Sequence, residues 1–341
     1  MKKEILVNAT PPEIRAALTE EGRAVEVFHE RRHRRGLVGN VYVGRIHRVL
    51  PGMQAAFVSI GLDRDAFLYV EDALPRSTDL IAELEEEEPP ARPPAESARP
   101  RIDDLVKEGQ EIVVQVTKDP IAGKGPRVTA NLSLPGRTLV YLPGMRGATV
   151  SRRISDEAER ERLRQILESL PAPGGFIART AAAGCAPEEF EADRRYLTEL
   201  AAHIGKKGET ASAPLLLHRE LDLALRVVRD LAGSDVAAIR VDDEATHARL
   251  SEFLAAVAPG LLSRLELDRG ELPLFERFGI EAEIERALAS RVSLASGGYV
   301  VIHQTEALVA IDVNTGKFVG KDALEDTVFQ TNLEAIPEIA R

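Results

Sequence analysis

The sequence predicts an α+β protein of several domains, and three observations support that prediction. The chain has 341 residues, enough for roughly two or three ordinary domains with their own cores. Between Leu37 and about Asn131, short β-type runs are separated by glycine and proline, which is typical of a small barrel. From Leu132 onward, strand-like and helix-like runs are mixed, which is the pattern of an α+β fold.

The segments that precede and form the predicted barrel are short. Residues 1–36 contain two strand-like runs, EILVNA and AVEVFHERR, which are too little chain to fold alone. The barrel strands are expected in the runs LVGNVYVGRIHRVL, AAFVSI, AFLYV and EIVVQVT. An acidic, proline-rich insertion interrupts them from about Pro75 to Pro100. Its composition cannot bury a core, so we expect a mobile loop there.

The rest of the chain contains three further groups of elements. Residues 132–214 contain the strand-like runs TLVYLP and GGFIART and the helical run EAERERLRQILESL, with Ser155 as its expected N-cap. Residues 215–288 contain the helix LALRVVRDLAG and the strand VAAIRVD. Residues 289–341 predict a β-hairpin in SLASGGYVVIHQTEALVAIDV and then a final helix, which Pro337 should kink or end.

Composition excludes several classes of protein. The single cysteine, Cys185, rules out a disulfide framework and a Cys-based zinc site within one chain. The start MKKEILVNAT lacks the apolar region of a secretory signal, and no run of about 18 apolar residues predicts a membrane span, so a reducing, cytoplasmic setting fits. The net charge of −11 argues against a simple basic nucleic-acid wrapper, although the run RRHRR at 31–35 is locally basic.

The segment Glu306–Lys317, EALVAIDVNTGK, is the strongest candidate for chemistry. An apolar run leads into Asp312, and Asn314 follows, so we expect a buried strand that presents a carboxylate and then a carboxamide at a turn. A carboxylate at a strand end is a common position for a Mg²⁺ ligand, because Mg²⁺ prefers hard oxygen atoms and keeps several waters. The alternative is a plain turn, since Asp, Asn and Gly gather after strands for backbone reasons alone.

Six segments carry a resemblance to a known family. They are ILVNATPPEIRAAL, RRGLVGNVYVGRIHRVLPGMQAAFVSIGLDRDAFL, VVQVTKDPIAGKGPRVT, GGFIARTAA, GELPLF and SGGYVVIHQTEALVAIDVNTGKFVG. In this order, and over nearly the whole chain, they resemble the RNase E/RNase G endoribonucleases. The wording LPGMQAAFV and FVGKDALEDTVF is nearer to the RNase G branch than to the RNase E branch.

The resemblance implies four subdomains. Residues 1–36 and 215–288 would together form an RNase H-like subdomain, into which other parts are inserted. Residues 37–131 would be an S1 barrel of the OB type, and residues 132–214 a 5′-sensor subdomain. Residues 289–341 would be an incomplete DNase I-like subdomain.

On the barrel, the resemblance implies that Phe57, Phe67 and Lys124 contact RNA. Taken alone, two phenylalanines on short strands are most often core residues, and a lysine between glycines is most often an exposed loop residue. Barrels of the OB type, however, stack single-stranded bases on aromatic rings, and a flexible ammonium group suits a phosphate. We therefore expect these three side chains to bind single-stranded RNA.

The resemblance places a pocket for the 5′-monophosphate of the substrate at Arg179 and Thr180, with Gly136 and Val140 as its other wall. An arginine suits this role because its planar fork of donors matches phosphate oxygens. Without the resemblance, an Arg-Thr pair at a strand end would be an unremarkable surface pair. The preferred RNA would then carry a 5′-monophosphate.

In the catalytic motif, the resemblance makes Asp312 a Mg²⁺ ligand and Asn314 the residue that positions the water or the phosphate. A second metal-binding aspartate and a zinc-binding cysteine pair of the family have no match up to Arg341. We therefore expect an N-terminal part of an endoribonuclease of RNA processing and decay, with weak or no Mg²⁺ binding, no zinc, and weak or no cleavage. The parent protein would be a homo-oligomer.

Two other functions remain open at this stage. The chain could be a non-catalytic RNA-binding module that keeps the barrel and the 5′-end pocket. It could also be a barrel-containing translation or transcription factor, although the combined presence of Arg179–Thr180 and the DVNTG run argues against that reading.

Overall fold

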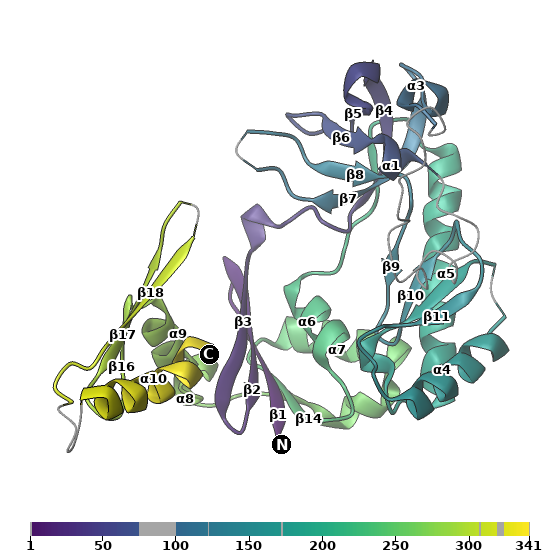
Figure 1. Cartoon of the computed structure of the whole chain (residues 1–341). Coiled ribbons are helices and arrows are strands. Elements are labelled where there is room, and N and C mark those ends of the chain that lie inside the picture. The colour runs from purple at the N-terminus through teal and green to yellow at the C-terminus, as the bar shows by residue number, and fades with distance from the viewer. Residues whose placement is uncertain are drawn as a thin grey trace.

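The computed structural model describes residues 2–74, 100–121, 123–171, 173–306, 308–318 and 324–340 (Figure 1). Within these ranges the strands form four sheets accompanied by helices, so the predicted α+β class is confirmed. Apart from Pro100, the acidic insertion expected between Pro75 and Pro100 lies outside the described residues. No helix in the described ranges has the length and apolar composition needed to cross a membrane.

The first sheet joins segments from opposite parts of the chain. Its order is β15–β14–β1–β2–β3, with β1 parallel to β14 and antiparallel to β2. Both faces of β1 are covered: Ile5 and Val7 pack in a core with α6 and α7, and Leu6 packs with α8 and α9. This explains why the run EILVNA is hydrophobic without alternation. The elements are β1 (Lys3–Ala9), β2 (Glu13–Glu20), β3 (Arg23–Arg31), η1 (Arg32–Arg34), α6 (Leu223–Leu231), β14 (Val236–Val241), α7 (Glu244–Val257), η5 (Pro259–Arg264), β15 (Leu265–Leu267), α8 (Leu274–Arg277) and α9 (Ile280–Leu288).

The second sheet is the predicted barrel. It runs β4–β5–β6–β8–β7 and closes because β4 also pairs with β7. Inward residues such as Val58, Leu68 and Val114 fill it. A further strand, β13, pairs with the first residues of β4, Val41–Val43. Residues 215–218 therefore belong to this sheet and not to the five-stranded one. The elements are β4 (Val41–Leu50), η2 (Pro51–Met53), β5 (Ala55–Ser59), β6 (Ala66–Tyr69), α1 (Val70–Ala73), α3 (Ile102–Leu105), β7 (Glu111–Lys118), β8 (Arg127–Thr129) and β13 (Leu215–His218).

The third sheet has the order β11–β12–β10–β9, and α4 and α5 contribute to its core. The expected helix is present, but its N-cap is Asp156, whose carboxylate accepts a hydrogen bond from the amide of Ala158, and not Ser155. The helix α5, which extends over 24 residues, was not predicted from the sequence. The elements are β9 (Leu134–Pro135), β10 (Leu139–Leu142), β11 (Ala148–Val150), α4 (Glu157–Ser169), β12 (Gly175–Ala178), η4 (Thr180–Ala182) and α5 (Pro187–Thr210).

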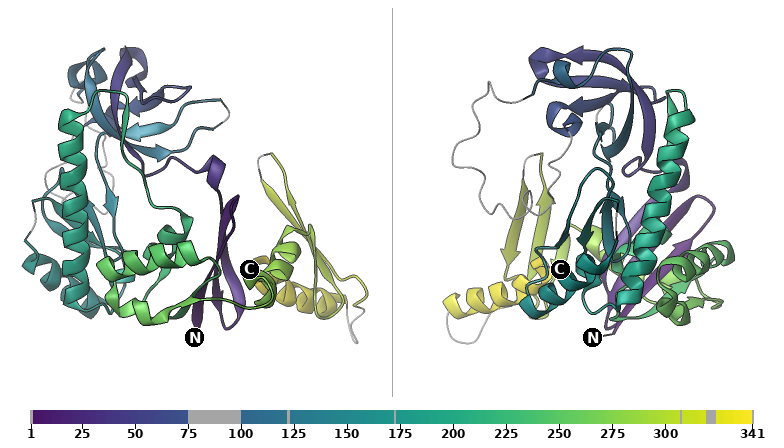
Figure 2. Two further views of the ribbon diagram at one scale, coloured as in Figure 1. Left: turned by 180° about the vertical axis from the view of Figure 1, so that it is seen from behind. Right: turned by 90° about the vertical axis from the view of Figure 1, so that its right-hand side faces the viewer.

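The fourth sheet, β16–β17–β18, and α10 form a unit that projects from the rest of the molecule, as two further views show (Figure 2). The predicted hairpin is confirmed, because β17 and β18 are antiparallel partners. The helix α10 continues through Pro337 to Ala340, so the proline does not end it. The elements are β16 (Arg291–Ser293), β17 (Tyr299–Gln304), β18 (Val309–Asn314) and α10 (Leu324–Ala340).

The expectation of a buried strand before Asp312 is wrong. Strand β18 is at the edge of its sheet, and Val309 and Ile311 are 54% and 43% exposed. Apolar sequence alone could not show this, because burial depends on a second layer packing on the strand. Asp312 itself lies within the strand, opposite Val301, and not in a turn after it.

Candidate functional site

Two aromatic side chains lie on the outer face of the barrel. Phe57 on β5 and Phe67 on β6 are direct cross-strand partners, and their ring centroids are 5.6 Å apart at an interplanar angle of 74°. Each is flanked in sequence by buried residues that point inward, such as Ala56 and Leu68, so strand alternation turns both rings outward. The rings are half-buried and are not part of the barrel's buried core.

A third ring continues this row. Tyr69 lies two residues after Phe67 on the same face of β6, with ring centroids 4.5 Å apart. The guanidinium carbon of Arg127 lies 4.7 Å from the centre of the Tyr69 ring. Tyr69 was not among the predicted RNA-binding residues, although the period of two in AFLY places it on the face of Phe67. We call Phe57, Phe67 and Tyr69 the aromatic row.

Lys124 lies beside one end of the aromatic row. It shares the lining of a hollow of about 450 Å³ with Phe57, His47 and Asp65. The neighbouring Gly125 lies against the backbone carbonyl of Asp65, where a Cβ atom would overlap that oxygen. The loop can therefore reach this position because residue 125 is glycine. One ring nitrogen of His47 lies 2.6 Å from the Asp65 carboxylate, which fixes the imidazole at the rim.

Arg179 follows β12 in the third sheet and reaches into the neighbouring unit. Its Nη1 donates to the carbonyl of Gly136 at 2.5 Å and to the Asp230 carboxylate on α6 at 2.7 Å. Thr180 is exposed, with its hydroxyl 3.4 Å from that of Ser151. The structure thus brings Gly136, Arg179 and Thr180 together.

Val140 is placed in the same sheet but in an apolar setting. It pairs with Ile177, two residues before Arg179, and packs in a small cluster with Leu142 and Met145. By strand alternation Val140 lies on the sheet face opposite Leu139 and Tyr141, which belong to the core under α5. Val140 therefore lies in an apolar cluster, and its side chain offers a phosphate no hydrogen bond.

A buried carboxylate contacts the backbone directly after Gly136. Asp193 on α5 accepts hydrogen bonds from the backbone amides of Arg137, Thr138 and Leu139 at 3.2, 2.8 and 2.8 Å. Burial raises the pKa of Asp193 above its ordinary value, although these hydrogen bonds act in the opposite direction. A Cβ atom on Gly136 would overlap the Asp193 carboxylate, so packing is enough to explain glycine at this position.

Asp230 controls the charge near Arg179. Burial opposes ionisation of Asp230, but the hydrogen bond and charge of Arg229, together with the charge of Arg179, hold the pKa of Asp230 below its ordinary value. The Asp230 carboxylate therefore remains ionised at neutral pH and compensates part of the positive charge of Arg179 and Arg229. A phosphate that approaches Arg179 must compete with this ion pair.

Asp312 and Asn314 lie together on β18. The Nδ2 atom of Asn314 donates to the Asp312 carboxylate at 2.8 Å. Val313, between them, packs toward Val300 and Ala335, so Asp312 and Asn314 lie on the face of the hairpin away from α10. Asp312 is exposed, and Asn314 is half-buried.

The oxygen atoms of this pair are of the kind that Mg²⁺ prefers, since they are a carboxylate and an amide. Across the described ranges, however, no group of three or more His, Cys, Asp or Glu side chains is arranged to hold a metal ion. Asp312 can therefore contribute one carboxylate to a Mg²⁺ ion that keeps most of its waters. This fits a hydrated ion and does not fit a closed protein cage.

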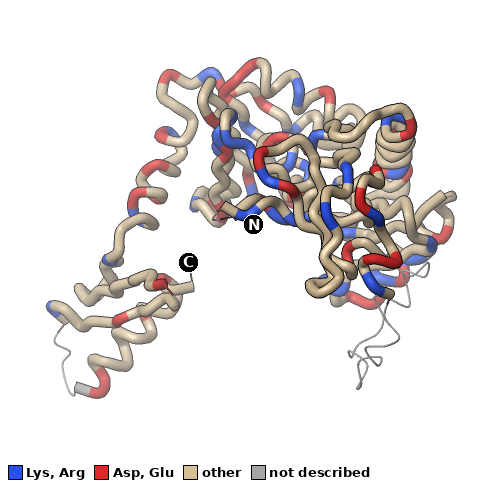
Figure 3. Tube along the Cα trace, turned by 90° about the horizontal axis from the view of Figure 1, so that it is seen from above, with Lys and Arg blue, Asp and Glu red and all other residues tan. Residues whose placement is uncertain are grey.

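The three sets of residues do not converge. Figure 1 shows the barrel, the third sheet and the β16–β18 unit as separate parts of the molecule. Basic and acidic residues are interspersed along the described chain when it is viewed from above (Figure 3). A long single strand could contact more than one of these sites, whereas a small ligand could not.

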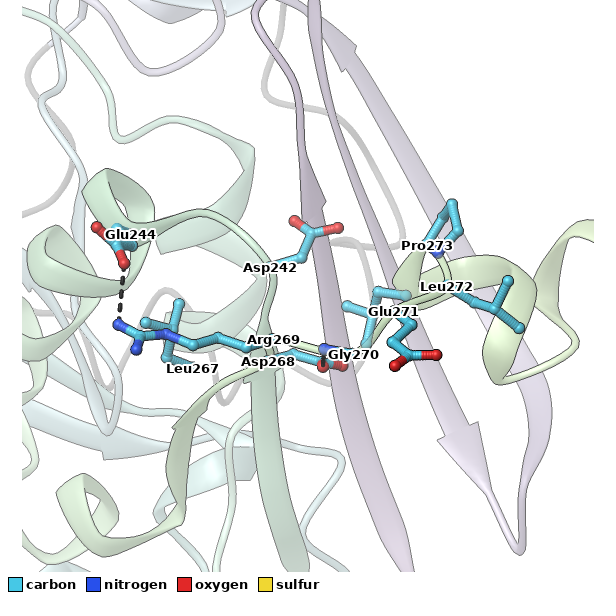
Figure 4. A pocket seen from close by; sticks show the side chains of 10 residues that line it. Asp242, Glu244, Leu267, Asp268, Arg269, Gly270, Glu271, Leu272 and Pro273 are labelled. Atoms are coloured by element: carbon cyan, nitrogen blue, oxygen red, sulfur yellow. Dashed lines mark hydrogen bonds and ion pairs between the residues drawn. The ribbon is translucent and has the colours of Figure 1, made fainter.

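A further hollow, of about 600 Å³, lies where β14 and β15 end (Figure 4). Several of its charged side chains already have partners: Arg269 pairs with Glu244 at 2.9 Å, and Asp242 accepts hydrogen bonds from Asn8 and from the amide of Ala9. Asp268 is paired with Arg277. Residues 270–274 of this hollow belong to the GELPLF segment that carries the family resemblance, but no site residue was predicted there.

Fold and site together define a mixed α+β protein with a closed five-stranded barrel, consistent with an S1/OB-like domain, that displays outward aromatic rings. Residues 133–341 match the Ribonuclease E/G family. The chain is 45% identical over 342 residues to Ribonuclease G of Escherichia coli K12, covering 100% of this chain and 68% of that protein. The chain belongs to the Ribonuclease E/G family, as the sequence motifs predicted.

Two other relatives agree with this assignment. The chain is 42% identical to Ribonuclease G of Haemophilus influenzae over 99% of this chain and 67% of that protein. It is 37% identical to Ribonuclease E of the same organism over 99% of this chain and 35% of that protein. The similarity therefore extends through both the barrel and the β16–β18 unit.

Proposed function

We propose that this chain is the RNA-binding part of a Mg²⁺-dependent, single-strand-specific endoribonuclease and carries one of the acidic residues of its catalytic site. The outward aromatic pair on the barrel is the observation that supports it most. A barrel needs its large side chains inside, and two half-exposed phenylalanines are better suited to stacking bases than to packing. Family membership indicates the class of reaction, and the barrel would bind the RNA.

The family assignment also suggests how the parts divide. The first sheet would be the RNase H-like subdomain, the barrel the S1 subdomain, the third sheet the 5′-sensor and the β16–β18 unit part of a DNase I-like subdomain. The topology supports the first of these, since residues 3–31 and 236–267 complete one sheet around the inserted parts.

The barrel would hold RNA through Phe57, Phe67 and Lys124. Bases stack on the two rings while the Lys124 ammonium, on the adjacent loop, contacts a phosphate. The hollow shared by Phe57 and Lys124 supports this arrangement, because it brings an apolar surface and a positive charge to one place. Such a grip is tolerant of sequence, because every base has a stacking face.

Arg179 and Thr180 would read the 5′-monophosphate of the substrate. The Arg179 guanidinium is held in place by Gly136 and Asp230, and the exposed Thr180 hydroxyl lies on the next residue. A fixed guanidinium binds a phosphate at a lower cost in side-chain entropy than a mobile one. Asp230 would lower the affinity and so limit binding of weaker anions.

For cleavage, Asp312 would hold Mg²⁺, which lowers the pKa of water and neutralises charge on phosphoryl oxygens. The hydrogen bond from Asn314 orients the Asp312 carboxylate, and the Asn314 amide oxygen remains suited to a water or a phosphate-bound proton. The products would carry a 5′-phosphate. We expect weak Mg²⁺ binding and slow cleavage, because within the described ranges Asp312 does not belong to a group of three or more metal-binding side chains. We also expect no bound zinc, and a cytoplasmic protein whose parent is a homo-oligomer.

A non-catalytic RNA-binding module is the second candidate, because among the residues that the structure describes no group of three or more His, Cys, Asp or Glu side chains is arranged to hold a metal ion. A time course with 5′-monophosphorylated single-stranded RNA, with and without Mg²⁺, separates the two. We expect cleavage far slower than that by Ribonuclease G of Escherichia coli, and its loss in Asp312→Asn. Cleavage that is unchanged in Asp312→Asn would refute the role of this residue.

A further inference from the structure

We propose that Tyr69 and Arg127 form a third base-stacking position on the barrel, directly after Phe67. This inference rests on the proposed function of the barrel as a site for single-stranded RNA. It adds a position that the family motifs do not assign, and it extends the path of the RNA along β6 toward α1.

The continuity of the aromatic row is the first argument. Phe57 and Phe67 are 5.6 Å apart and Phe67 and Tyr69 are 4.5 Å apart, both at interplanar angles of 74°. Strand pairing and alternation place all three rings on one outer face of the barrel. A strand of RNA that stacks on the first two rings is therefore led onto the third.

The exposure of Tyr69 is the second argument. It is 39% exposed, although its neighbour Leu68 is completely buried. Aromatic rings that are aligned and exposed on one face are typical of binding surfaces, whereas isolated exposed apolar residues are common and need no explanation. The row is therefore a better candidate for a binding surface than any one of its members alone.

The fixed position of Arg127 is the third argument. Its guanidinium lies 4.7 Å from the Tyr69 ring centre and pairs with Asp72 at 2.7 Å. The backbone carbonyl of Asp72 in turn accepts hydrogen bonds from the amide of Ala130 and the hydroxyl of Thr129. The guanidinium plane is thus held against the ring. Arginine planes stack bases in many RNA-binding proteins.

The ion pair between Asp72 and Arg127 also predicts which interaction this position would contribute to RNA binding. Because Asp72 compensates the charge of Arg127, the position should contribute through stacking and not through attraction to phosphate. Contacts to phosphate depend steeply on salt, and stacking contacts do not. The contribution of Tyr69 should therefore be nearly independent of salt, in contrast to that of Lys124.

The test is a titration of 3′-fluorescein-labelled 12-nucleotide oligoadenylate with a 5′-hydroxyl, in EDTA, at two salt concentrations. EDTA prevents Mg²⁺-dependent cleavage, and the 5′-hydroxyl leaves the Arg179 pocket without its phosphate. We expect Tyr69→Leu to weaken binding about fivefold or more, with the same factor at both salt concentrations, and Tyr69→Phe to stay within about twofold of the unmodified chain. Tyr69→Leu binding as tightly as the unmodified chain would overturn the proposal.

Tyrosine emission gives a second readout that does not depend on affinity. The chain has five tyrosines and no tryptophan, so tyrosine fluorescence can be observed directly. Saturating RNA should quench the emission, and Tyr69→Phe should remove part of that quenching while affinity is kept. Identical quenching in Tyr69→Phe and the unmodified chain would contradict the proposal, and this holds even if Tyr69→Leu fails to fold.

Phe57→Leu distinguishes failure of this inference from failure of the proposed function. If Phe57→Leu weakens binding and Tyr69→Leu does not, the RNA site is upheld and the third position is wrong. If neither substitution changes binding, or the unmodified chain does not bind this RNA, the proposed function of the barrel fails as well.

Discussion

The barrel and the β16–β18 unit present their candidate residues on very different supports. Among the residues that the structure describes, twelve buried hydrophobic residues form the barrel's core beneath the aromatic row, whereas three lie between the β16–β18 sheet and α10. The rings on the barrel contact one another and Arg127, whereas Asp312 is exposed on an edge strand and is oriented by Asn314. The helix α10 in addition exposes Phe329 by 63%.

This difference indicates that the candidate RNA-binding rings are held more firmly in position than the candidate metal ligand Asp312. A binding surface on a closed, packed barrel is held in position before RNA arrives. A carboxylate on an edge strand can hold a hydrated ion but cannot by itself fix its geometry. RNA affinity and RNA cleavage should therefore respond to different substitutions.

The largest effect should be the loss of stability caused by substituting Leu68, compared with its neighbour Phe67, which points to the opposite side of the barrel wall. Leu68 is completely buried, and Leu68→Ala should lower the free energy of unfolding by about 2–5 kcal/mol. Phe67→Ala should cost clearly less, because the ring is half-exposed. Urea unfolding of both variants measures this. Equal losses would show that Phe67 is a core residue.

The next largest effect is expected in the affinity for RNA. Phe57→Ala should weaken binding of single-stranded RNA by about 1–3 kcal/mol, because one stacked base is lost. The melting temperature should change little. A sharp fall in melting temperature, with no separate effect on RNA binding, would move Phe57 back to the barrel core.

The Arg179 pocket should show a smaller, selective effect. Arg179→Ala should abolish the preference for a 5′-monophosphate over a 5′-hydroxyl, a preference that we expect to be about tenfold, or ~1.4 kcal/mol. Titrating both RNAs with each variant measures it. Arg164→Ala is the matched control, since it removes a charge from a surface helix of the same unit, where ion pairs contribute little.

In the same titration, Asp230→Asn should increase the preference, because Arg179 then loses its competing carboxylate. The effects of Arg179→Ala and Phe57→Ala should add, because distant sites usually act independently. Equal affinity of the unmodified chain for the two RNA ends would remove the sensor assignment.

The smallest expected effect is a dependence of stability on pH at the third sheet. Hydrogen bonds from Arg162, and from the amide of Gly184, outweigh burial and lower the pKa of Glu159 from 4.5 to about 2. Because the folded pKa is depressed, this stabilisation is present above about pH 4.5 and is lost as the pH falls toward 2.

Glu159→Gln should therefore reduce the dependence of stability on pH between about 4.5 and 2, measured by thermal unfolding at each pH. RNA binding at neutral pH should not change, because Glu159 is remote from the barrel. An unchanged pH dependence in Glu159→Gln would show that other carboxylates account for it.

Much of the fold could be predicted from local patterns. Short runs with glycine punctuation identified the barrel, and the hairpin before α10 followed from two apolar runs around a turn. The direction of Phe57 could not be decided from the sequence alone, because the register of each strand, which sets inward or outward, depends on its partners. The resemblance selected it, and the structure shows the ring outside.

Other features needed the tertiary structure. The exposure of β18 depends on which layers pack on it, and the apolar run ALVAI at 307–311 contains no signal for that. The link between Arg179, directly after β12, and Asp230, on α6, joins residues that are 51 positions apart in the sequence. The N-cap of α4 is Asp156 and not the predicted Ser155. Both residue types are good N-caps, and only the backbone geometry distinguishes them.

The central claim is that this chain binds RNA through the barrel and independently of the Asp312 site. Its most direct test compares Phe57→Ala with Asp312→Ala in one titration of single-stranded RNA in EDTA, with melting temperatures recorded for both. We predict that Phe57→Ala weakens binding by about 1–3 kcal/mol and that Asp312→Ala binds like the unmodified chain. Weaker binding in Asp312→Ala, with no change in Phe57→Ala, would contradict the account.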